Sequence, residues 1–295
     1  RASRSERNTP MSIDLTPPPT APASPEQQPP RQPTRSSAQI VSIIAMSVGG
    51  LLLLGTLVSG VGSIAWAATD RGEGGRTADA AGVTGLSLDV SAGHLVVEYA
   101  DVDEAILTVD GNRDWTLERR GETLSLSNSR PWWALQVGFD PTENRATLTL
   151  PAAMADEKLA ADFDVAAGSI TADGTYGRLD VSVGAGDATV TGTADDVSVD
   201  VSAGDADVTI DGAQRANLTI GAGQITADLR GDSLDAVRVD VSAGTLLASL
   251  PDEAYRVTSD VSVGTFDNRL QTSTSASRTI DAQVSAGTAT LRPGE

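Results

Sequence analysis

The sequence predicts an all-β protein: a β-solenoid of about 20-residue rungs with a strand-rich N-terminal cap region, preceded by one transmembrane helix. Three observations lead to this prediction. A short phrase ending in glycine recurs eight times, apolar and polar residues alternate on both sides of it, and a long uncharged apolar stretch precedes the array. Such repeats are typical of solenoids, because each rung buries its apolar face only by stacking on its neighbours.

The first segment, residues 1–37, is rich in proline, serine, threonine and arginine. It holds few large apolar residues, so it cannot bury enough surface to offset the entropy of ordering. We therefore expect a disordered tail. Met11 lies inside this tail, which leaves the true translation start open.

Residues 38–68 are predicted to form a transmembrane helix. No charged residue lies between Arg35 and Asp70. Ile40–Trp66 would span roughly 40 Å as a helix, against about 30 Å for a bilayer core. Basic residues precede the helix and acidic residues follow it, so the positive-inside rule places the tail in the cytoplasm and the C-terminal domain outside the cell membrane. The lipid bilayer is thus the first expected partner.

A cleaved signal peptide is the competing interpretation, because Ala65-Trp66-Ala67 resembles a small-x-small cleavage site. The apolar run is long for a signal peptide, which favours the anchor, but whether Ala67 marks a cleavage site stays open. Residues 69–85, rich in glycine, alanine, threonine and arginine, are predicted to be a flexible linker.

The repeated phrase defines the rungs. It ends at Gly93, Gly168, Gly186, Gly204, Gly223, Gly244, Gly264 and Gly287. The residue three positions before each glycine is β-branched, and the apolar positions shift by one residue beyond the glycine. This shift indicates a corner or bulge, where glycine tolerates positive φ and close approach of backbones. Residues 161–292 are therefore predicted to be stacked rungs, each of two short strands and a turn.

Residues 86–160 are less regular and are predicted to form an N-terminal β cap or lead-in module. They contain the first copy of the phrase and most large aromatic residues of the outer part. Terminal repeats are usually atypical because they must cover an open sheet edge. At the other end, Pro293 follows the last rung in the sequence and is expected to block further strand addition.

Composition and charge exclude several functions. The chain has 295 residues, with 40 acidic against 21 basic, one histidine and no cysteine. The lack of cysteine excludes a disulfide scaffold, a thiol nucleophile and a thiolate metal site. A net charge of −19 repels phosphate backbones, so no nucleic-acid binding is expected.

No catalytic, cofactor-binding or metal-binding residues are assigned, and the protein is predicted not to be an enzyme. His94 is interpreted as a surface histidine, since no second histidine or cysteine can join it. Gly184-Ala185-Gly186 and Gly221-Ala222-Gly223 resemble half of a dinucleotide fingerprint. Both lack its third glycine and its helix, so they are interpreted as rung corners.

The outward aspartates leave one question open. Asp240 and Asp260 share a column and, in adjacent rungs, would stack about 4.8 Å apart. Asp205 and Asp207 also share a face, and a bridging Ca²⁺ would relieve such repulsion. The calcium-binding nonapeptide is missing and exposed carboxylates are screened by salt, which favours a solvated surface.

The order of these features resembles one known family. A membrane segment, a strand-rich lead-in, the strand-then-proline phrase at 146–151 and repeated V-S-A-G-D-like rungs are similar to the bacterial putative-adhesin family, a domain of unknown function, over roughly residues 86–292. The resemblance implies a right-handed-solenoid-like all-β repeat in a surface or envelope protein. It names no catalytic residues.

The expected function is a membrane-anchored extracytoplasmic adhesin-like binding or structural module of the bacterial envelope, with an envelope protein or a glycan as ligand. Two alternatives stay open. One is an envelope sensor, in which the outer domain binds a partner and the tail reports inside the cell. The other is a carbohydrate-active enzyme, for which two carboxylates in a groove beside Trp132 or Trp133 would suffice. The ligand and the oligomeric state are not determined by the sequence.

Overall fold

The computed structural model describes residues 76–111, 114–128, 144–232 and 234–294. These residues form β-strands and one short 3-10 helix at Ala152–Met154, which confirms the all-β prediction. Within them, no helix is both long enough and apolar enough to cross a membrane. The predicted tail and the predicted transmembrane segment lie outside the described residues.

Nineteen strands make up the described part of the chain. They are β1 (Arg76–Ala78), β2 (Gly85–Val90), β3 (His94–Ala100), β4 (Ala105–Asp110), β5 (Trp115–Arg120), β6 (Thr123–Asn128), β7 (Arg145–Pro151), β8 (Leu159–Val165), β9 (Ser169–Val183), β10 (Asp187–Val201), β11 (Asp205–Asp211), β12 (Arg215–Ile220), β13 (Gln224–Arg230), β14 (Ala236–Val241), β15 (Thr245–Leu250), β16 (Arg256–Val261), β17 (Thr265–Asn268), β18 (Thr279–Val284) and β19 (Thr288–Pro293).

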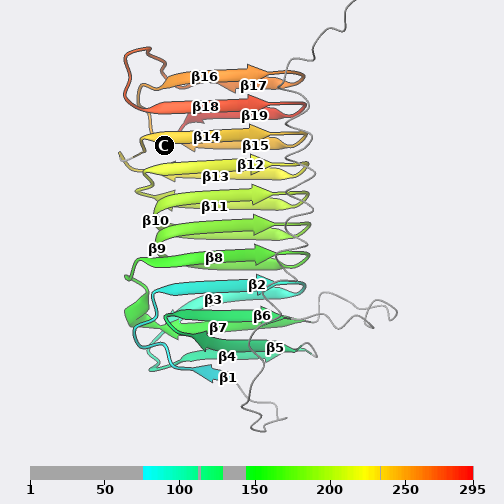
Figure 1. The fold of residues 1–295 in the computed structure, drawn as a ribbon, viewed down its shortest axis with the longest axis vertical. Coiled ribbons are helices and arrows are strands. Elements are labelled where there is room, and N and C mark those ends of the chain that lie inside the picture. Colours follow the sequence, from blue (N-terminus) through cyan, green and yellow to red (C-terminus); the bar gives the residue numbers. More distant parts are fainter. Residues whose placement is uncertain (1–75, 112–113, 129–143, 233, 295) are drawn as a thin grey trace, which may run out of the picture. The chain divides into compact units, whose positions relative to one another are not determined.

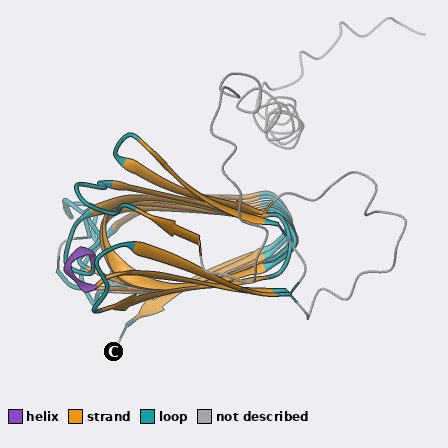
Figure 2. Ribbon diagram, turned by 90° about the horizontal axis from the view of Figure 1, so that it is seen from below, coloured by secondary structure: helices purple, strands orange, loops and turns teal. Residues whose placement is uncertain are grey.

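Each rung consists of a strand, a three-residue bend that ends in glycine, and a second strand running back. In one such rung, β12 leads into the bend at 221–223 and β13 leads out of it. Strands before the glycine stack into one sheet, here called the front sheet, and strands after it stack into a facing back sheet (Figures 1 and 2). In β9 and β10 the back strand of one rung continues directly into the front strand of the next. The glycine is therefore a corner between two sheets and not a bulge.

Neighbouring rungs are parallel and in register. Val181 lies opposite Val199, and Val201 lies opposite Ile220, so each inward residue stacks on the corresponding residue of the next rung. Nearly all of these inward columns are buried. The predicted alternation of inward apolar and outward polar residues is thus confirmed, because the pleat sends successive side chains to opposite faces.

Close approach explains the corner glycines better than positive φ does. A Cβ atom on Gly168 or on any later phrase glycine would lie between 1.9 and 2.4 Å from the glycine carbonyl oxygen of the neighbouring rung. Of the eight phrase glycines, only Gly93 and Gly264 have positive φ, at 108° and 136°. The glycines therefore let successive backbones touch at the corner.

Near the C-terminal end, the order of rungs in space differs from their order in the chain. β18 and β19 lie between β14–β15 and β16–β17, so the last rung of the sequence is inside the stack (Figure 1). The inward residues of β18 are all apolar, whereas β16 carries Ser259 in an inward column. Placing β18 inside buries more apolar surface than placing β16 there would.

Two sequence predictions are wrong for this reason. Asp240 and Asp260 do not stack on each other, because Gln283 lies between them as the register partner of both. Pro293 does not end the stack, because it lies opposite Leu250 in an interior rung. Both predictions assumed that consecutive rungs are neighbours in space.

The other end of the stack is closed by antiparallel strands. The rung of β2 and β3 lies between β6–β7 and β8–β9, and β5, β4 and β1 continue beyond it with antiparallel pairing (Figure 1). Residues 76–85, predicted to be part of a linker, belong to this folded end. Arg76–Ala78 pair with β4, and Ala80 and Val83 are buried. Burial of these two small apolar side chains keeps the segment against the core.

A buried asparagine satisfies the first corner at the closed end. In the rungs above, corner amides donate to carbonyls of the rung before, as Gln224 N–H does to the Gly204 oxygen at 3.0 Å. At the first corner the His94 amide donates to the Asn144 oxygen at 2.8 Å. The Asn128 side chain, at the end of β6, accepts a hydrogen bond from the Ser91 amide at 2.7 Å and donates one to the Ala92 carbonyl. Asn128 thereby pairs two backbone groups of this corner.

Candidate binding face on the front sheet

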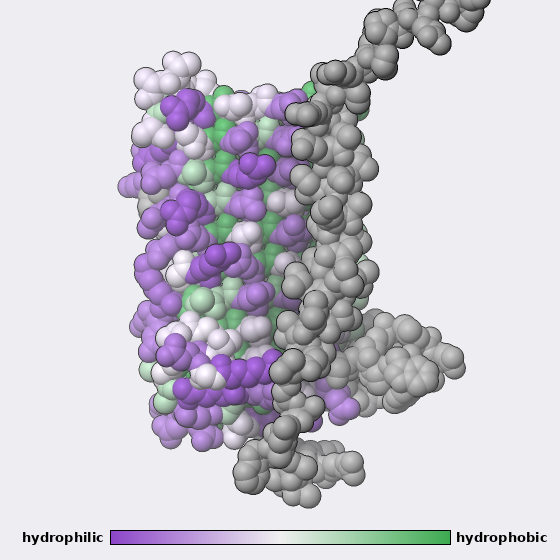
Figure 3. Space-filling view, in the orientation of Figure 1, coloured by the Kyte–Doolittle hydropathy of each residue, from purple (hydrophilic) through white to green (hydrophobic). Residues whose placement is uncertain are grey.

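The outward side chains of the front sheet form a regular grid. Alternation along each strand sends three side chains per rung outward, at eight, six and four residues before the glycine. In-register stacking aligns these positions into columns across β9, β10, β12, β14 and β18. Hydrophilic side chains cover much of this face of the stack (Figure 3).

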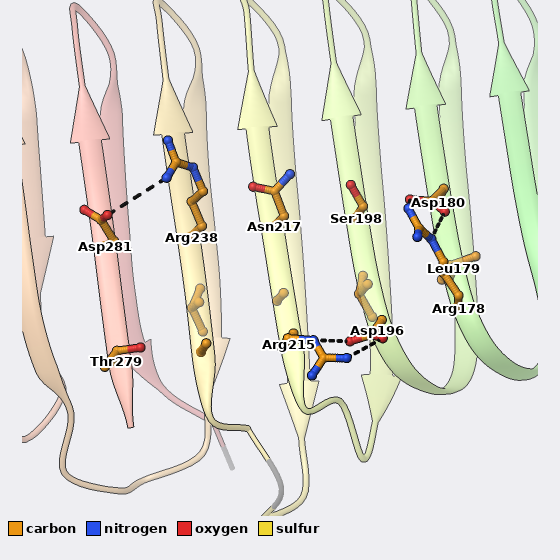
Figure 4. Close-up of a pocket in the computed structure, with 14 residues that line it drawn as sticks. Arg178, Leu179, Asp180, Asp196, Ser198, Arg215, Asn217, Arg238, Thr279 and Asp281 are labelled. Atoms are coloured by element: carbon orange, nitrogen blue, oxygen red, sulfur yellow. Dashed lines mark hydrogen bonds and ion pairs between the residues drawn. The ribbon is translucent and has the colours of Figure 1, made fainter. Parts of the chain in front are cut away.

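A shallow groove of about 630 Å³ lies on this face. Its outward lining is three arginines, three aspartates and small polar residues, namely Arg178, Asp180, Asp196, Ser198, Arg215, Asn217, Arg238, Thr279 and Asp281 (Figure 4). These outward side chains thus line a polar, open depression rather than an enclosed pocket.

Each arginine of the groove has an aspartate beside it. Arg178 Nε lies 2.6 Å from Asp180 Oδ2 on the same strand, and Arg215 Nε lies 2.7 Å from Asp196 Oδ1 on the neighbouring strand (Figure 4). Arg238 Nη1 and an oxygen of the aspartate on β18 are 4.0 Å apart. More than half of each arginine side chain is exposed, so these pairs add little to stability. Their free N–H groups and carboxylate oxygens are available to a ligand.

A second feature of the face is an acidic cluster next to the groove. Asp89 lies opposite Asp164, and Asp162 lies opposite Asp180, on adjacent strands. Partial burial raises the pKa of Asp164, and repulsion from Asp89 and Asp162 raises it further. Partial burial also raises the pKa of Asp162, with a further increase from Asp180. These carboxyl groups bind protons more readily than free aspartate does.

The residues considered from the sequence lie apart from one another. His94 is on the back sheet, half-buried, with Nδ1 2.6 Å from Ser169 Oγ. Among the described residues, no carboxylate hydrogen-bonds to its imidazole, so the pair lacks the third member of a catalytic triad. The glycine pairs at 184–186 and 221–223 form rung corners, as predicted. Trp132 and Trp133 lie outside the described residues.

The calcium hypothesis gains no support from the geometry. Asp205 on the back sheet lies opposite Asp187 and Gln224, and Asp207 lies opposite two threonines. The described residues contain no group of three or more acidic or histidine side chains arranged to hold a metal ion.

The groove was missed at the level of sequence, although a signal for it exists. Arg178, Asp196 and Arg215 each stand eight residues before a phrase glycine, in three consecutive rungs. Alternating opposite charges at one repeat offset indicate a ladder of ion pairs once the rungs are stacked in register.

Comparisons with known proteins find few similarities. No family model matches the chain, and no curated protein matches it. A solved structure described as a putative adhesin from Bacteroides fragilis has 12% identity and a TM-score of 0.41, covering 74% of this chain and 95% of its own. One described as a putative cell adhesion protein from Clostridium sporogenes has 12% identity and a TM-score of 0.35, covering 75% and 98%. We draw no functional argument from similarity at this level, and membership of the putative-adhesin family stays a prediction.

Proposed function

We propose that this protein is a membrane-anchored, extracytoplasmic adhesin-like module of the bacterial envelope that binds a partner and does not catalyse a reaction. The observation that carries the proposal is the front-sheet groove, an open polar depression built from outward side chains of five stacked rungs. Extended surfaces of this kind are typical of solenoid-like repeats, which contact ligands over many repeats without a deep pocket. The predicted transmembrane segment 38–68 supports the anchored arrangement.

The chemistry of the groove favours a charged polypeptide as partner. Its lining presents arginine guanidinium groups and aspartate carboxylates in alternation, which complements a chain carrying both charges. The described lining contains no aromatic ring on which a sugar could stack. An envelope protein is therefore preferred to a glycan as the ligand.

The test is capture from envelope extracts by the full chain, held through its N-terminal tail in nanodiscs. Asp196→Ala combined with Arg215→Ala should reduce capture at least tenfold, which corresponds to about 1.4 kcal/mol. Asp207→Ala, on the exposed outer side of the back sheet, is the matched control and should bind as the unmodified chain does.

Treatment of the extract separates the two classes of partner. Digestion with protease should abolish capture, and periodate oxidation of sugars should leave it intact. The opposite pattern would identify a glycan. Equal capture by the groove variant and the control would show that the front-sheet groove is not the binding site.

A further inference from the structure

The two ends of the stack differ in how their backbone edges are completed. The closed end carries antiparallel strands and the buried Asn128, whereas β16 and β17 pair, within the described residues, only with β18 and β19. At this second end, here called the open end, two large hydrophobic residues are exposed: Val261 at 40% and Val263 at 71%. Val263 occupies a corner position that is also exposed in interior rungs, as at Ala203 and Ala222. Val261 belongs to an inward column that is buried in the interior rungs, so this core column reaches the surface at the open end.

The hydrogen bonds show which backbone groups of β16 point away from β18. The Arg256 amide donates to the Arg278 oxygen and the Ser262 amide to the Val284 oxygen, both at 2.9 Å. Even-numbered residues of β16 thus bond toward β18. Because successive residues of a strand direct their amide and carbonyl groups to opposite edges, those of Val257, Ser259 and Val261 point to the open edge.

Within the described residues, the chain itself covers only the beginning of this edge. The Tyr255 amide donates to the Gln271 oxygen, and the Ser273 amide donates to the Tyr255 oxygen, both at 2.9 Å. The segment 271–273 therefore occupies the open edge beside Tyr255, where Thr272 forms an isolated parallel bridge with it. The stretch from Val257 to Val261 has no such cover in the described residues.

We propose that this stretch pairs antiparallel with the same stretch of a second copy, about a two-fold axis that passes through Ser259. In this register Ser259 faces Ser259 of the second copy, and Val257 faces its Val261. All three of these pairs carry outward-directed backbone groups, so each can exchange two hydrogen bonds across the interface. The interaction is independent of the front-sheet groove and goes beyond the function proposed above.

Neighbouring registers are excluded by the structure. An axis at Thr258 would place Val261 against Tyr255 of the second copy, where the 271–273 segment already lies. An axis at Asp260 would place two Asp260 carboxylates directly opposite each other, which is unfavourable. An axis midway between two consecutive residues would place inward-pointing side chains of one copy opposite outward-pointing side chains of the other. The axis at Ser259 avoids all three conflicts.

The side chains match in the chosen register. Val257 and Val261 form two apolar pairs that continue the inward columns of both stacks. On the outer side, Thr258 faces Asp260 of the second copy. The stack already contains such a pair, because Thr191 Oγ1 donates to Asp173 Oδ2 at 2.5 Å across adjacent strands.

The size of the open end indicates a weak association. The six residues of β16 extend about 20 Å. The two sheets lie about 10 Å apart and their outward side chains widen the stack further, so the end face measures roughly 450 Å² per copy. The buried total of about 900 Å² is below the roughly 1,000 Å² expected of a stable specific interface and lies in the range of weak, transient contacts. Pairing is therefore expected where copies are concentrated, as they would be on one membrane or between two apposed membranes.

Cysteine cross-linking tests the register directly, since the chain has no cysteine of its own. Directly opposed residues in this register have Cα atoms about 5.5 Å apart, within the range that a disulfide spans. In the full chain in detergent, Ser259→Cys should form disulfide dimers at least ten times faster than Ser202→Cys. Ser202 is the matched control because it is an exposed serine at an interior corner. Any pairing through the membrane segment is common to both variants.

A second substitution confirms that the contact is the open end. Val261→Lys in the Ser259→Cys background should reduce cross-linking at least tenfold, whereas Thr226→Lys on the back sheet should leave it unchanged. Circular dichroism checks that both variants fold. Equal cross-linking of Ser259→Cys and Ser202→Cys, or no effect of Val261→Lys, would overturn the proposal. So would protection of the Val257, Ser259 and Val261 amides from hydrogen exchange in monomers, because a segment of the same chain would then cover the edge.

Discussion

Gly223→Ala should destabilise the protein strongly, although it adds one methyl group at a corner. The new Cβ would lie 1.9 Å from the Gly204 carbonyl oxygen and 2.8 Å from Val201 Cγ1. An ordinary contact needs about 3.4 Å or more, and the rungs cannot separate because backbone ladders hold them about 4.8 Å apart. Overpacking of this kind costs about 1–3 kcal/mol. Loss of the hydrogen bond from Gln224 to Gly204, 3.0 Å long, adds about 1 kcal/mol.

The expected loss is therefore about 3 kcal/mol in the free energy of unfolding, measured by urea denaturation with circular dichroism. Gly177→Ala is the matched control, because its Cβ would meet nothing closer than 3.6 Å and its φ is not in the left-handed region. It should change stability by no more than about 0.5 kcal/mol. Equal stability of the two variants would refute the view that contact between successive backbones makes glycine necessary at the corners.

Three further predictions concern stability. Asn128→Ala should cost about 3 kcal/mol, because it leaves a half-buried amide and a buried carbonyl at the first corner unpaired, whereas Asn217→Ala on the outer face should cost less than about 0.5 kcal/mol by the same urea assay. Asp164→Asn should increase the free energy of unfolding by about 0.5–1 kcal/mol at pH 7, seen as a higher melting temperature, and by less at pH 4. Because the pKa of Asp164 is raised in the folded state, this carboxyl group stabilises the fold at pH values below its unfolded pKa of 3.8, and that stabilisation is lost as the pH rises. Equal shifts in melting temperature at pH 7 and pH 4 would contradict this expectation. Val284→Ala should cost about 2 kcal/mol and Val261→Ala almost nothing, since the first is 1% exposed and the second 40%; the reverse order would mean that the rungs stack in chain order.

Much of a single rung could be predicted from the sequence. The alternation around Gly223 identifies both strands, their inward faces and the corner, because the pleat and the three-residue bend are local properties of the chain. The same logic, applied to the position eight residues before each glycine, would have revealed the ion pair between Arg215 and Asp196. The boundary at residue 85 was harder to predict, because Ala80 and Val83 are too few apolar residues to indicate a buried segment.

The order of the rungs and the nature of the two ends were decided only by the tertiary structure. β16 and β18 share the same alternation of inward and outward positions before a corner glycine, so either could follow β14 as far as that alternation is concerned. Burial selects β18 for the interior, because its inward residues are all apolar and those of β16 are not. The sequence by itself thus determined the all-β class, the rung and its corner glycine. The tertiary structure decided which rungs touch, which edge stays open and which residues neighbour Asp240. These features depend on contacts between segments far apart in the sequence, and the arrangement that buries the most apolar area is preferred.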